Sequence, residues 1–356
     1  MNVIDLFSGC GGLSYGFVEA GCNVIIGVDN DDAALKTFEY NHPNSKGLNL
    51  DLFDESFVNE LAKQVGDRSV DIIVGGPPCQ GFSLTGTRNE EDPRNKLYKA
   101  MFLAAKRFRP KAILIENVPS IQKLYNGKFY DLIISEFEKN GEYNFGSKIL
   151  YAPDYGVPQI RRRIFFIGIR KDIGKVVFPK PTNNASNYVT CSDAISDLPS
   201  LEENLGEDIQ EYLNNPLTEY QKMMRKNSDK LYNHIATNHT QAVKNVISQV
   251  PDGGNYKDLP EGVGNSRNFN EAWTRYDSKK PSKTIDTGHR NHFHYKYNRI
   301  PTVRENARLQ SFPDNFIFIG NKTQQYRQVG NAVPPLLSYH IAKSILEVIG
   351  DANEKN

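Results

Sequence analysis

The segment Val3-Ile4-Asp5-Leu6-Phe7-Ser8-Gly9-Cys10-Gly11-Gly12 joins a short apolar run to a glycine-rich turn. The apolar run predicts a buried strand, and glycines at this place let the backbone approach a ligand at the start of a helix. Asp29 follows later in the chain, at a position where an acid can bind the hydroxyls of a ribose. The glycine spacing differs from the Gly-x-Gly-x-x-Gly of dinucleotide sites, which disfavours a nicotinamide cofactor. A tight turn without a ligand is the alternative interpretation.

Apolar runs alternate with amphipathic stretches through the part of the chain that follows this turn. The runs predict strands at Val3–Phe7, Val24–Val28, Leu48–Leu52, Asp71–Val74, Ala112–Ile115, Lys148–Tyr151 and Ile164–Ile169. The amphipathic stretches predict helices at Asp31–Tyr40, Phe57–Gln64, Leu97–Phe108 and Tyr130–Lys139. This alternation predicts an α/β fold with a doubly wound, mostly parallel sheet. Ligands of such sheets bind beyond the carboxyl ends of the strands.

The pattern changes near Pro179, where Pro, Asn, Gly and acidic residues become frequent. We interpret residues 182–300 as a smaller, irregular domain and residues 1–181 together with 301–356 as the main domain. A helical run at Leu336–Ile349, preceded by two prolines, predicts that the C-terminus returns to the main domain. The chain of 356 residues exceeds the about 250–300 residues at which a single core usually stops growing.

Composition indicates a folded protein, with 38% hydrophobic and 24% charged residues and a formal net charge of +1. The apolar runs are too short to cross a bilayer, and no basic and apolar leader precedes the first strand. Cysteines at positions 10, 22, 79 and 191 lack the spacing of a metal site or a disulfide framework. We therefore expect a cytoplasmic protein in a reducing environment.

Charge is distributed unevenly along the second half of the chain. Between Asp193 and Glu219 there are eight acidic residues and no Lys or Arg. Between Arg267 and Arg304 there are nine Lys or Arg residues against three acids. The basic stretch suits a phosphate-rich partner, and an ordinary solvated face explains it equally well.

Cys79 lies in the segment Gly75-Gly76-Pro77-Pro78-Cys79-Gln80-Gly81-Phe82-Ser83. Two prolines before it and a glycine after it indicate a presented cysteine, whereas the alternative is a cysteine buried as a small apolar residue. A thiol with a pKa of about 8.5 needs cationic neighbours to become a nucleophile at pH 7. Arg161 and Arg163 are the candidates, because alternation along a strand places both on one face.

Two acids follow other predicted strands. Glu116 ends the run Ala112–Ile115, where partial desolvation suits it to proton donation; capping of the next element is the alternative. Asp51 could accept a hydrogen bond from an adenine amino group, although a lone Asp after a strand is more often a helix cap.

These motifs, in their order, resemble the DNA cytosine-5 methyltransferases. The resemblance rests on Asp-Leu-Phe-Ser-Gly-x-Gly-Gly, Gly-Pro-Pro-Cys-Gln-Gly-Phe-Ser, Glu-Asn-Val, Gln-x-Arg-x-Arg, the stretch Arg304–Asp314 and the stretch Gln328–Pro334. It extends from Val3 to about Ile349 and is interrupted by the irregular middle. It implies a class I methyltransferase fold of the Rossmann type, with a target-recognition domain at 182–300.

The resemblance also implies a site for S-adenosylmethionine, which would leave as S-adenosylhomocysteine. Its lining would be Phe7, Gly9, Gly11, Asp29, Asn30, Asp51, Leu52, Pro78, Asn331 and Ala332. Asp29 stands where many relatives carry Glu, which keeps the carboxylate but shortens its reach. Arg304–Asp314 would be structural, and Gly81 to about Asn95 would be a mobile loop that closes over DNA.

The chemistry implied by the resemblance begins with attack by Cys79 on carbon 6 of cytosine, which makes carbon 5 nucleophilic. Glu116 would hydrogen-bond to ring nitrogen 3, Arg163 would bind the exocyclic carbonyl, and Arg161 would help to hold Glu116 and the ring. The methyl group then passes to carbon 5, the proton there is removed, and Cys79 leaves. The target base must be flipped out of the duplex for this chemistry.

Recognition of the DNA sequence would belong to the irregular domain. Thr284-Ile285 resembles the Thr-aliphatic landmark of the family's recognition domain, and Arg and Asn side chains suit guanine and adenine edges. The expected DNA-contact residues are Gln80, Ser83, Arg88, Arg94, Arg267, Arg275, Thr284, His289, Arg290 and Asn291. The group His289, His292 and His294 lacks an evident fourth ligand, so we expect no metal.

Three rival functions differ in what the sequence should contain. An RNA-directed relative usually carries a Cys-Phe-Thr signature in its recognition region, which this sequence lacks. A catalytically inactive DNA-binding relative typically loses the Cys, the Glu or an Arg, and all are present. A nicotinamide oxidoreductase is disfavoured by the glycine spacing. We expect a prokaryotic or phage monomer in the cytoplasm, associated with the nucleoid and with double-stranded DNA, and either paired with a separate restriction endonuclease or solitary.

Overall fold

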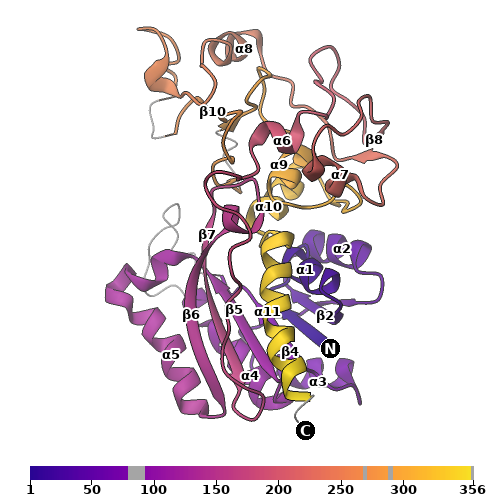
Figure 1. Cartoon of the computed structure of the whole chain (residues 1–356), viewed down its shortest axis with the longest axis vertical. Helices are drawn as coiled ribbons and strands as arrows, with labels where there is room; N and C mark the ends of the chain where they lie inside the picture. Colours follow the sequence, from indigo (N-terminus) through magenta and orange to yellow (C-terminus); the bar gives the residue numbers. More distant parts are fainter. Residues whose placement is uncertain (79–92, 268–270, 288–291, 354–356) are drawn as a thin grey trace. The chain divides into compact units, whose positions relative to one another are not determined.

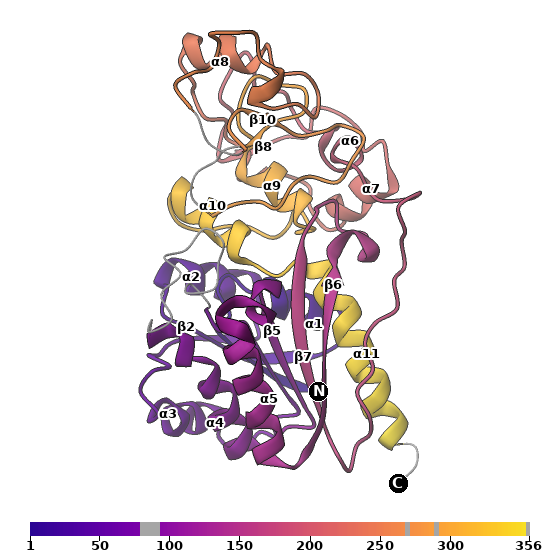
Figure 2. The ribbon, with the colours of Figure 1, turned by 90° about the vertical axis from the view of Figure 1, so that its left-hand side faces the viewer.

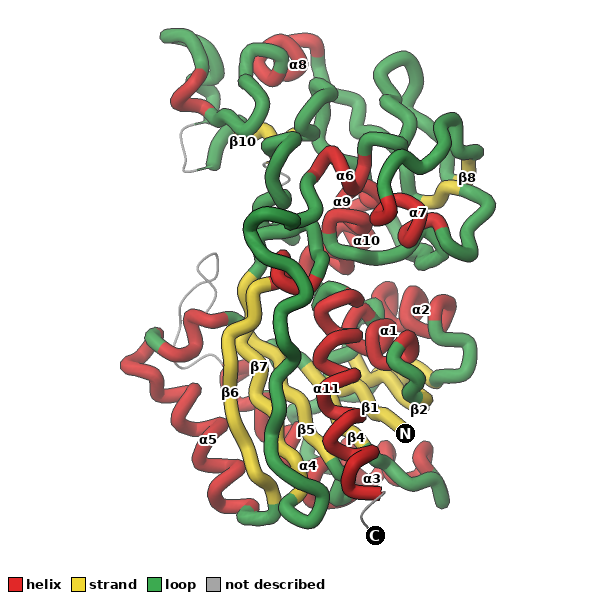
Figure 3. Tube along the Cα trace, in the orientation of Figure 1, coloured by secondary structure: helices red, strands yellow, loops and turns green. Residues whose placement is uncertain are grey.

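A computed structural model describes residues 1–78, 93–267, 271–287 and 292–353 (Figure 1). Contacts between residues divide the chain into two compact units. Unit 1 comprises Met1–Tyr151, Arg162–Lys180 and Pro335–Asn356, and unit 2 comprises Ala152–Arg161 and Pro181–Pro334. Figure 3 shows that long strands belong to unit 1, whereas loops dominate unit 2.

Unit 1 is built on a sheet with the strand order β3-β2-β1-β4-β5-β7-β6, seven strands over the described residues. The strands are β1 (Asn2–Leu6), β2 (Asn23–Asp29), β3 (Lys46–Asn49), β4 (Ile72–Gly75), β5 (Ala112–Asn117), β6 (Tyr143–Tyr151) and β7 (Arg162–Arg170). Strands β1 to β5 pair in parallel, while β7 runs antiparallel to both of its neighbours. The predicted mostly parallel, doubly wound sheet is confirmed.

Helices cover both faces of this sheet, as a doubly wound fold requires. They are α1 (Gly12–Glu19), α2 (Asp32–Asn41), α3 (Phe57–Val65), α4 (Tyr98–Phe108), α5 (Lys128–Asn140) and α11 (Pro335–Asn353). Helix α1 packs against α11, and α3 packs against α4. Figure 2 shows α3, α4 and α5 on one side of the sheet and α11 on the other. Strands β1, β2, β4, β5 and β7 are buried on both faces over most of their length, which explains their continuous apolar runs.

Two strands differ from their predicted positions by at least three residues at one end. Strand β3 ends at Asn49 rather than at position 52, because Asp51 starts a turn in which its side chain accepts a hydrogen bond from the Phe53 backbone at 2.9 Å. Strand β6 begins at Tyr143 rather than at position 148, and its first half contains polar residues such as Asn144 and Ser147. An edge strand tolerates polar side chains, so hydrophobicity alone did not indicate its start.

Unit 2 contains short elements joined by long irregular segments. They are α6 (Cys191–Ile195), β8 (Ile209–Gln210), α7 (Glu219–Arg225), β9 (Leu231–Tyr232), α8 (Gln241–Ile247), β10 (Thr274–Arg275), β11 (His292–Phe293), α9 (Val303–Leu309) and α10 (Lys322–Asn331). Segments 152–161 and 301–334 belong to this unit by contact, whereas the sequence placed them in the main domain. Residues 182–300 and the segment around α9 therefore pack together within unit 2.

Buried ion pairs hold unit 2 together around α9. Arg308 Nη1 lies 2.6 Å from Asp197, and its Nη2 lies 2.7 Å from Asp314. Arg299 binds both carboxylate oxygens of Glu305 at 2.7 Å. All five side chains are buried, so each charge is neutralised inside the protein. The structural interpretation of the stretch Arg304–Asp314 is confirmed by this network.

Candidate cofactor and catalytic sites

The carboxyl ends of four parallel strands meet in one row of the unit 1 sheet. Leu6 pairs with Val28 on one side and with Gly75 on the other, and Gly75 pairs with Ile115. The residues that come next in each strand are Phe7, Asp29, Gly76 and Glu116. The sheet register thus places the glycine turn, the acid of β2, the cysteine segment and the acid of β5 along one edge. This is the edge where ligands bind in such folds.

The Asp29 carboxylate connects the turn after β1 to the end of β2. Its Oδ2 accepts a hydrogen bond from the Gly9 backbone at 2.8 Å. Its Oδ1 accepts hydrogen bonds from the backbones of Asn30 at 2.8 Å and Asp31 at 3.0 Å. Burial raises the pKa of Asp29, and these backbone N–H donors oppose that rise. Asp29 therefore fixes the shape of the glycine turn in addition to its expected role toward a ribose.

The glycine turn has a left-handed backbone and open space on one side. Phe7, Gly9 and Gly11 have φ values of 63°, 53° and 94°. A Cβ atom on Gly9 would meet no heavy atom within 4 Å, whereas one on Gly11 would lie closer than 3.0 Å to the rings of His42 and Phe38. Gly11 is thus needed for packing, and Gly9 borders a space that a ligand can enter. The open side of this turn is thus free of protein atoms next to Gly9.

A buried acid that the sequence reasoning did not select lies beneath this turn. Asp5 is fully buried on β1, and its Oδ2 accepts a hydrogen bond from Ser14 Oγ at 2.6 Å. Burial raises the pKa of Asp5 to about 7. The signal was present in the sequence, because a lone acid inside an otherwise apolar strand requires a polar partner.

The other expected cofactor residues lie in both units. In unit 1, Leu52 is buried, Pro78 is half-buried, and Asn30 and Asp51 are exposed. In unit 2, Ala332 follows the last residue of α10, Asn331. The Ala332 carbonyl accepts hydrogen bonds from Arg161 Nη2 at 2.9 Å and from Gln310 Nε2 at 2.6 Å.

Glu116 and Arg163 form an ion pair at the carboxyl end of β5. Arg163 Nε lies 2.9 Å from Glu116 Oε1, and the side chains are 16% and 14% exposed. Burial lowers the pKa of Arg163, and the neighbouring Glu116 partly offsets this. The pair thus joins a fixed positive group to a carboxylate that retains a small accessible surface, which suits it to bind a polar planar ring.

The segment that leads to Cys79 lies against this ion pair. A Cβ atom on Gly76 would stand 3.0 Å from Glu116 Oε2, so the backbone there passes directly beside the carboxylate. Asn117 Nδ2 donates a hydrogen bond to the Pro77 carbonyl at 3.4 Å. The sequence reasoning did not assign Gly76 or Asn117 these roles, although both lie inside the motifs that it quoted. Cys79 itself lies outside the described residues.

Arg161 belongs to unit 2, whereas Arg163 belongs to unit 1. The Arg161 side chain is buried, and its guanidinium donates to the carbonyls of Gly330 at 3.2 Å and Ala332 at 2.9 Å. It also lies 3.4 Å from Gln159 Oε1. Arg161 thus helps to fix the C-terminal end of α10, which carries Asn331.

The Thr284 landmark pairs with the stretch that precedes Arg161. Thr284 Oγ1 donates to the Ile160 carbonyl at 2.6 Å, and the Ile160 backbone donates to Ser282 at 2.7 Å. Gln159 and Ser282 form a parallel bridge. The two motifs, far apart in sequence, therefore form one local structure in unit 2.

Arg275 requires a correction, because we expected it to read base edges. Its five N–H groups are all engaged inside unit 2, and the side chain is buried. The acceptors are Val250 O, His294 O, Tyr297 O, Ile247 O and Asn298 Oδ1. A contact with a base would require breaking these bonds, so Arg275 serves as a structural residue and not as a reader.

The remaining expected DNA contacts are placed as follows. Arg267 is half-buried, with its guanidinium 4.5 Å from the ring centroid of Trp273. Arg94 lies half-buried in the short 3-10 helix η1 (Pro93–Lys96). The residues that lie outside the described part of the chain are Gln80, Ser83, Arg88, His289, Arg290 and Asn291.

Among the described residues, no group of three or more His, Cys, Asp or Glu residues could hold a metal ion. In that part of the chain, no helix combines the length and the apolar character needed to cross a membrane.

The fold and the edge of the sheet define a class of protein. A doubly wound sheet with a glycine turn, four site residues in register at the carboxyl ends of its strands and an acid–arginine pair is the architecture of a Rossmann-like methyltransferase. A solved structure described as a DNA modification methyltransferase encoded within an Escherichia coli prophage matches with a TM-score of 0.81 and 28% identity, covering 98% of this chain and 99% of that one. The Dnmt2 methyltransferase of Schizosaccharomyces pombe shares the fold, with a TM-score of 0.58 at 16% identity.

Sequence comparison identifies the family. The model of the C-5 cytosine-specific DNA methylase family matches residues 1–347. The type II methyltransferase M.DdeI of Desulfomicrobium norvegicum is 39% identical over 99% of this chain and 92% of its own length. The type II methyltransferase M1.HphI of Haemophilus parahaemolyticus is 40% identical over 98% of this chain and 87% of its own length. The chain therefore belongs to the C-5 cytosine-specific DNA methylases, and it is a DNA cytosine-5-methyltransferase.

Proposed function

We propose that this enzyme transfers a methyl group from S-adenosylmethionine to carbon 5 of a cytosine flipped out of a short double-stranded DNA sequence, through a covalent bond to Cys79. The observation that carries the proposal is the Glu116–Arg163 pair beside Gly76 and Pro77, which lead directly to Cys79. Attack on a pyrimidine ring requires a nucleophile, an acid and a guanidinium, and the last two lie beside the backbone that leads to Cys79.

The residues around the glycine turn would hold the methyl donor. The backbone from Phe7 to Gly11 forms the cradle, and Asp29 at its side is placed to bind ribose hydroxyls. Asn30, Asp51, Leu52, Pro78, Asn331 and Ala332 complete the proposed lining. When bound, S-adenosylmethionine supplies an electrophilic methyl group on a sulfonium.

Glu116 and Arg163 would hold the cytosine ring during the reaction. Arg163 keeps Glu116 oriented, and both groups retain a small exposed surface for hydrogen bonds to the ring. As Cys79 adds to carbon 6, electrons move toward nitrogen 3, where a hydrogen bond from protonated Glu116 stabilises them. Carbon 5 then takes the methyl group, loses its proton, and the Cys79 sulfur leaves as the ring double bond re-forms.

Arg161 would act through the backbone that it binds. Its hydrogen bonds to the Gly330 and Ala332 carbonyls hold the end of α10 that contains Asn331. We therefore propose that Arg161 positions part of the cofactor lining in addition to any contact with Glu116.

Sequence recognition would fall to unit 2 and to the segment that follows Cys79. The proposed DNA contacts are Gln80, Ser83, Arg88, Arg94, Arg267, Thr284, His289, Arg290 and Asn291. We propose that the enzyme works as a monomer in a prokaryotic cytoplasm at the nucleoid, as the modifying partner of a separate restriction endonuclease or alone. The type II names of its relatives support the first arrangement.

Methylation sequencing tests this function directly. DNA from a methylation-deficient host that expresses this chain is expected to carry 5-methylcytosine within one short recurring sequence. The variant Cys79→Ser is expected to leave the DNA unmodified while still binding DNA and cofactor. Unmodified DNA from a host with folded wild-type protein would exclude the proposed DNA substrate, and full activity of the variant would exclude the covalent mechanism.

A further inference from the structure

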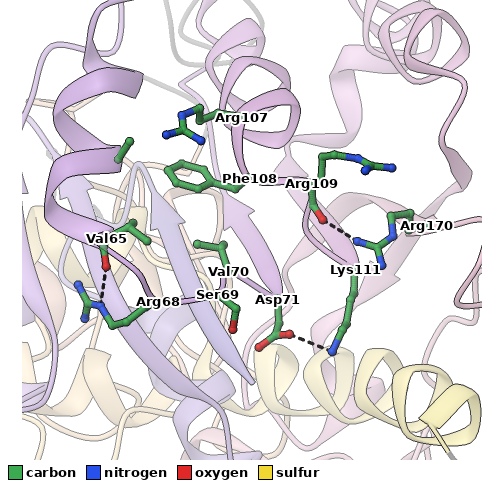
Figure 4. Close-up of a pocket in the computed structure, with 12 residues that line it drawn as sticks. Val65, Arg68, Ser69, Val70, Asp71, Arg107, Phe108, Arg109, Lys111 and Arg170 are labelled. Atoms are coloured by element: carbon green, nitrogen blue, oxygen red, sulfur yellow. Dashed lines mark hydrogen bonds and ion pairs between the residues drawn. The ribbon is translucent and has the colours of Figure 1, made fainter.

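A pocket opens in unit 1 at the opposite edge of the sheet from the proposed active site. It has a volume of about 360 Å³ and lies where α3 and α4 end and where β4 and β5 begin. Its walls combine Val65, Val70 and Phe108 with five basic side chains, which are Arg68, Arg107, Arg109, Lys111 and Arg170. In Figure 4, Phe108 and Val70 lie in the middle and the basic side chains surround them.

Three of the five cations are neutralised by carboxylates. Lys111 lies 3.0 Å from Asp71, Arg109 lies 3.1 Å from Glu142, and Arg170 lies 2.7 Å from Asp172. These ion pairs tie the pocket wall together, since Arg170 also donates to the Arg109 carbonyl at 2.7 Å. They give the pocket a rigid rim but no excess charge.

Arg68 and Arg107 supply an excess of two positive charges. Among the described residues, neither has a carboxylate partner. Arg68 donates to the carbonyls of Val65 at 2.9 Å and Gln64 at 2.5 Å, which caps α3. Arg107 has a different environment, because it lies 5.7 Å from the ring centroid of its neighbour Phe108. A structural function thus explains Arg68 but does not explain Arg107.

We propose that this pocket binds a mononucleotide. A terminal phosphate carries about −1.5 to −2 charges at pH 7, which matches the two unpaired guanidinium groups. The half-buried Phe108 ring offers an apolar face for a flat base, while Val65 and Val70 are buried in the pocket wall. The volume lies at the lower end of the about 300–1,000 Å³ typical of small-ligand sites, so the pocket suits one nucleotide better than a stretch of nucleic acid.

The test is calorimetric titration of the full-length enzyme with deoxyadenosine monophosphate, deoxyadenosine and inorganic phosphate. S-adenosylhomocysteine is kept at saturation so that the proposed cofactor site is filled. The mononucleotide is expected to bind more tightly than either of its parts. Arg107→Ala is expected to weaken its binding about tenfold or more, because a charged hydrogen bond is lost. The matched control is Lys106→Ala, which removes an exposed charge next to the pocket on the same helix.

Methylation by Arg107→Ala is expected to stay at the wild-type rate, since the residue lies at the opposite edge of the sheet. Absence of mononucleotide binding, or equal binding by the wild type and Arg107→Ala, would refute the proposal. Equal affinity for inorganic phosphate and for the mononucleotide would refute the base-binding surface. A loss of DNA affinity and of its salt dependence in Arg107→Ala, without mononucleotide binding, would show instead that the pocket contacts the DNA backbone.

Discussion

At the scale of single residues, the site depends on a few polar groups at the ends of apolar strands. Glu116 illustrates this, because its strand contributes only buried apolar residues until the carboxyl end. A carboxylate in such a place has little solvent, and Arg163 is the group that stabilises its charge. The orientation of this acid is therefore set by a single charged neighbour.

Replacing Glu116 by Gln tests its function in the reaction. The amide retains the size of the side chain but cannot deliver a proton to nitrogen 3. We expect kcat to fall by about 100-fold or more, since general acid catalysis typically contributes that much. Single-turnover methylation of a DNA duplex measures the effect. Glu142→Gln, which alters an exposed carboxylate on the same unit, should retain activity, and retention by Glu116→Gln as well would contradict the assignment.

The two glycines of the turn are expected to respond differently to alanine. Gly11→Ala adds a Cβ against His42 and Phe38, so it should lower the unfolding free energy by about 1–3 kcal/mol more than Gly9→Ala. Gly9→Ala places its methyl group in the open space and should weaken cofactor binding instead. Chemical denaturation and cofactor titration of both variants separate the two effects. Equal destabilisation by both would contradict the packing function of Gly11, and unchanged cofactor binding by Gly9→Ala would show that the space beside Gly9 is not a ligand site.

At the scale of elements, α9 shows how a short polar helix can form the centre of a domain. Its residues are buried throughout, and Thr302 caps its start with a hydrogen bond to the Glu305 backbone. His234 supports this cap, since its Nδ1 lies 2.8 Å from Thr302 Oγ1 and its Nε2 lies 2.9 Å from the Pro199 carbonyl. Burial lowers the pKa of His234 from 6.5 to about 4.

This histidine should make the protein sensitive to acid. The folded pKa lies below the unfolded value, so the unfolded chain binds the additional proton. The contribution of neutral His234 to the unfolding free energy is complete above about pH 6.5. It is lost as the pH falls toward 4, at a slope of about 1.4 kcal/mol per pH unit. Asp5, with its pKa raised to about 7, acts in the opposite direction over part of this range.

Denaturation of the wild type and of His234→Gln between pH 4.5 and 7 isolates the histidine, with the range chosen about its two pKa values. The unfolding free energy of the variant should fall less steeply as the pH decreases, because its unfolding takes up about one proton fewer than that of the wild type. Asp5 and the other groups are common to both proteins and cancel in the difference. Parallel profiles for the two proteins would show that His234 does not remain neutral in the folded state.

At the scale of the whole molecule, sequence reasoning recovered the sheet of unit 1 because each of its central strands is a continuous apolar run. It also selected Glu116, Arg163 and the glycine turn, since these residues follow such runs. It could not determine that all N–H groups of the Arg275 side chain are hydrogen-bonded within unit 2, because composition does not reveal which carbonyl groups lie near a side chain. Nor could it assign segment 301–334 to unit 2, because helical periodicity shows which face is buried but not against which partner.

Arg308 connects distant parts of the chain within unit 2, since Asp197 lies 111 positions before it. Arg308→Ala would remove the shared cation from two buried acids, which would keep Arg225 and the more distant Arg304 as neighbours, and should lower stability by about 3 kcal/mol. Lys63→Ala breaks an exposed pair with Glu60 and should leave stability nearly unchanged. Thermal unfolding compares the two variants. A small effect of Arg308→Ala would mean that water or other cations replace the guanidinium.

The packing of α11 on α1 has a consequence for the synthesis of the protein. Ser338 Oγ donates to the Leu13 carbonyl at 2.5 Å, and Gly16 lacks a side chain where Ser338 and Pro335 approach it. Helix α1 is synthesised long before its partner α11, because all of unit 2 is translated between them. The packing of unit 1 therefore cannot be completed before α11 has left the ribosome, and the apolar face of α1 lacks its partner until then.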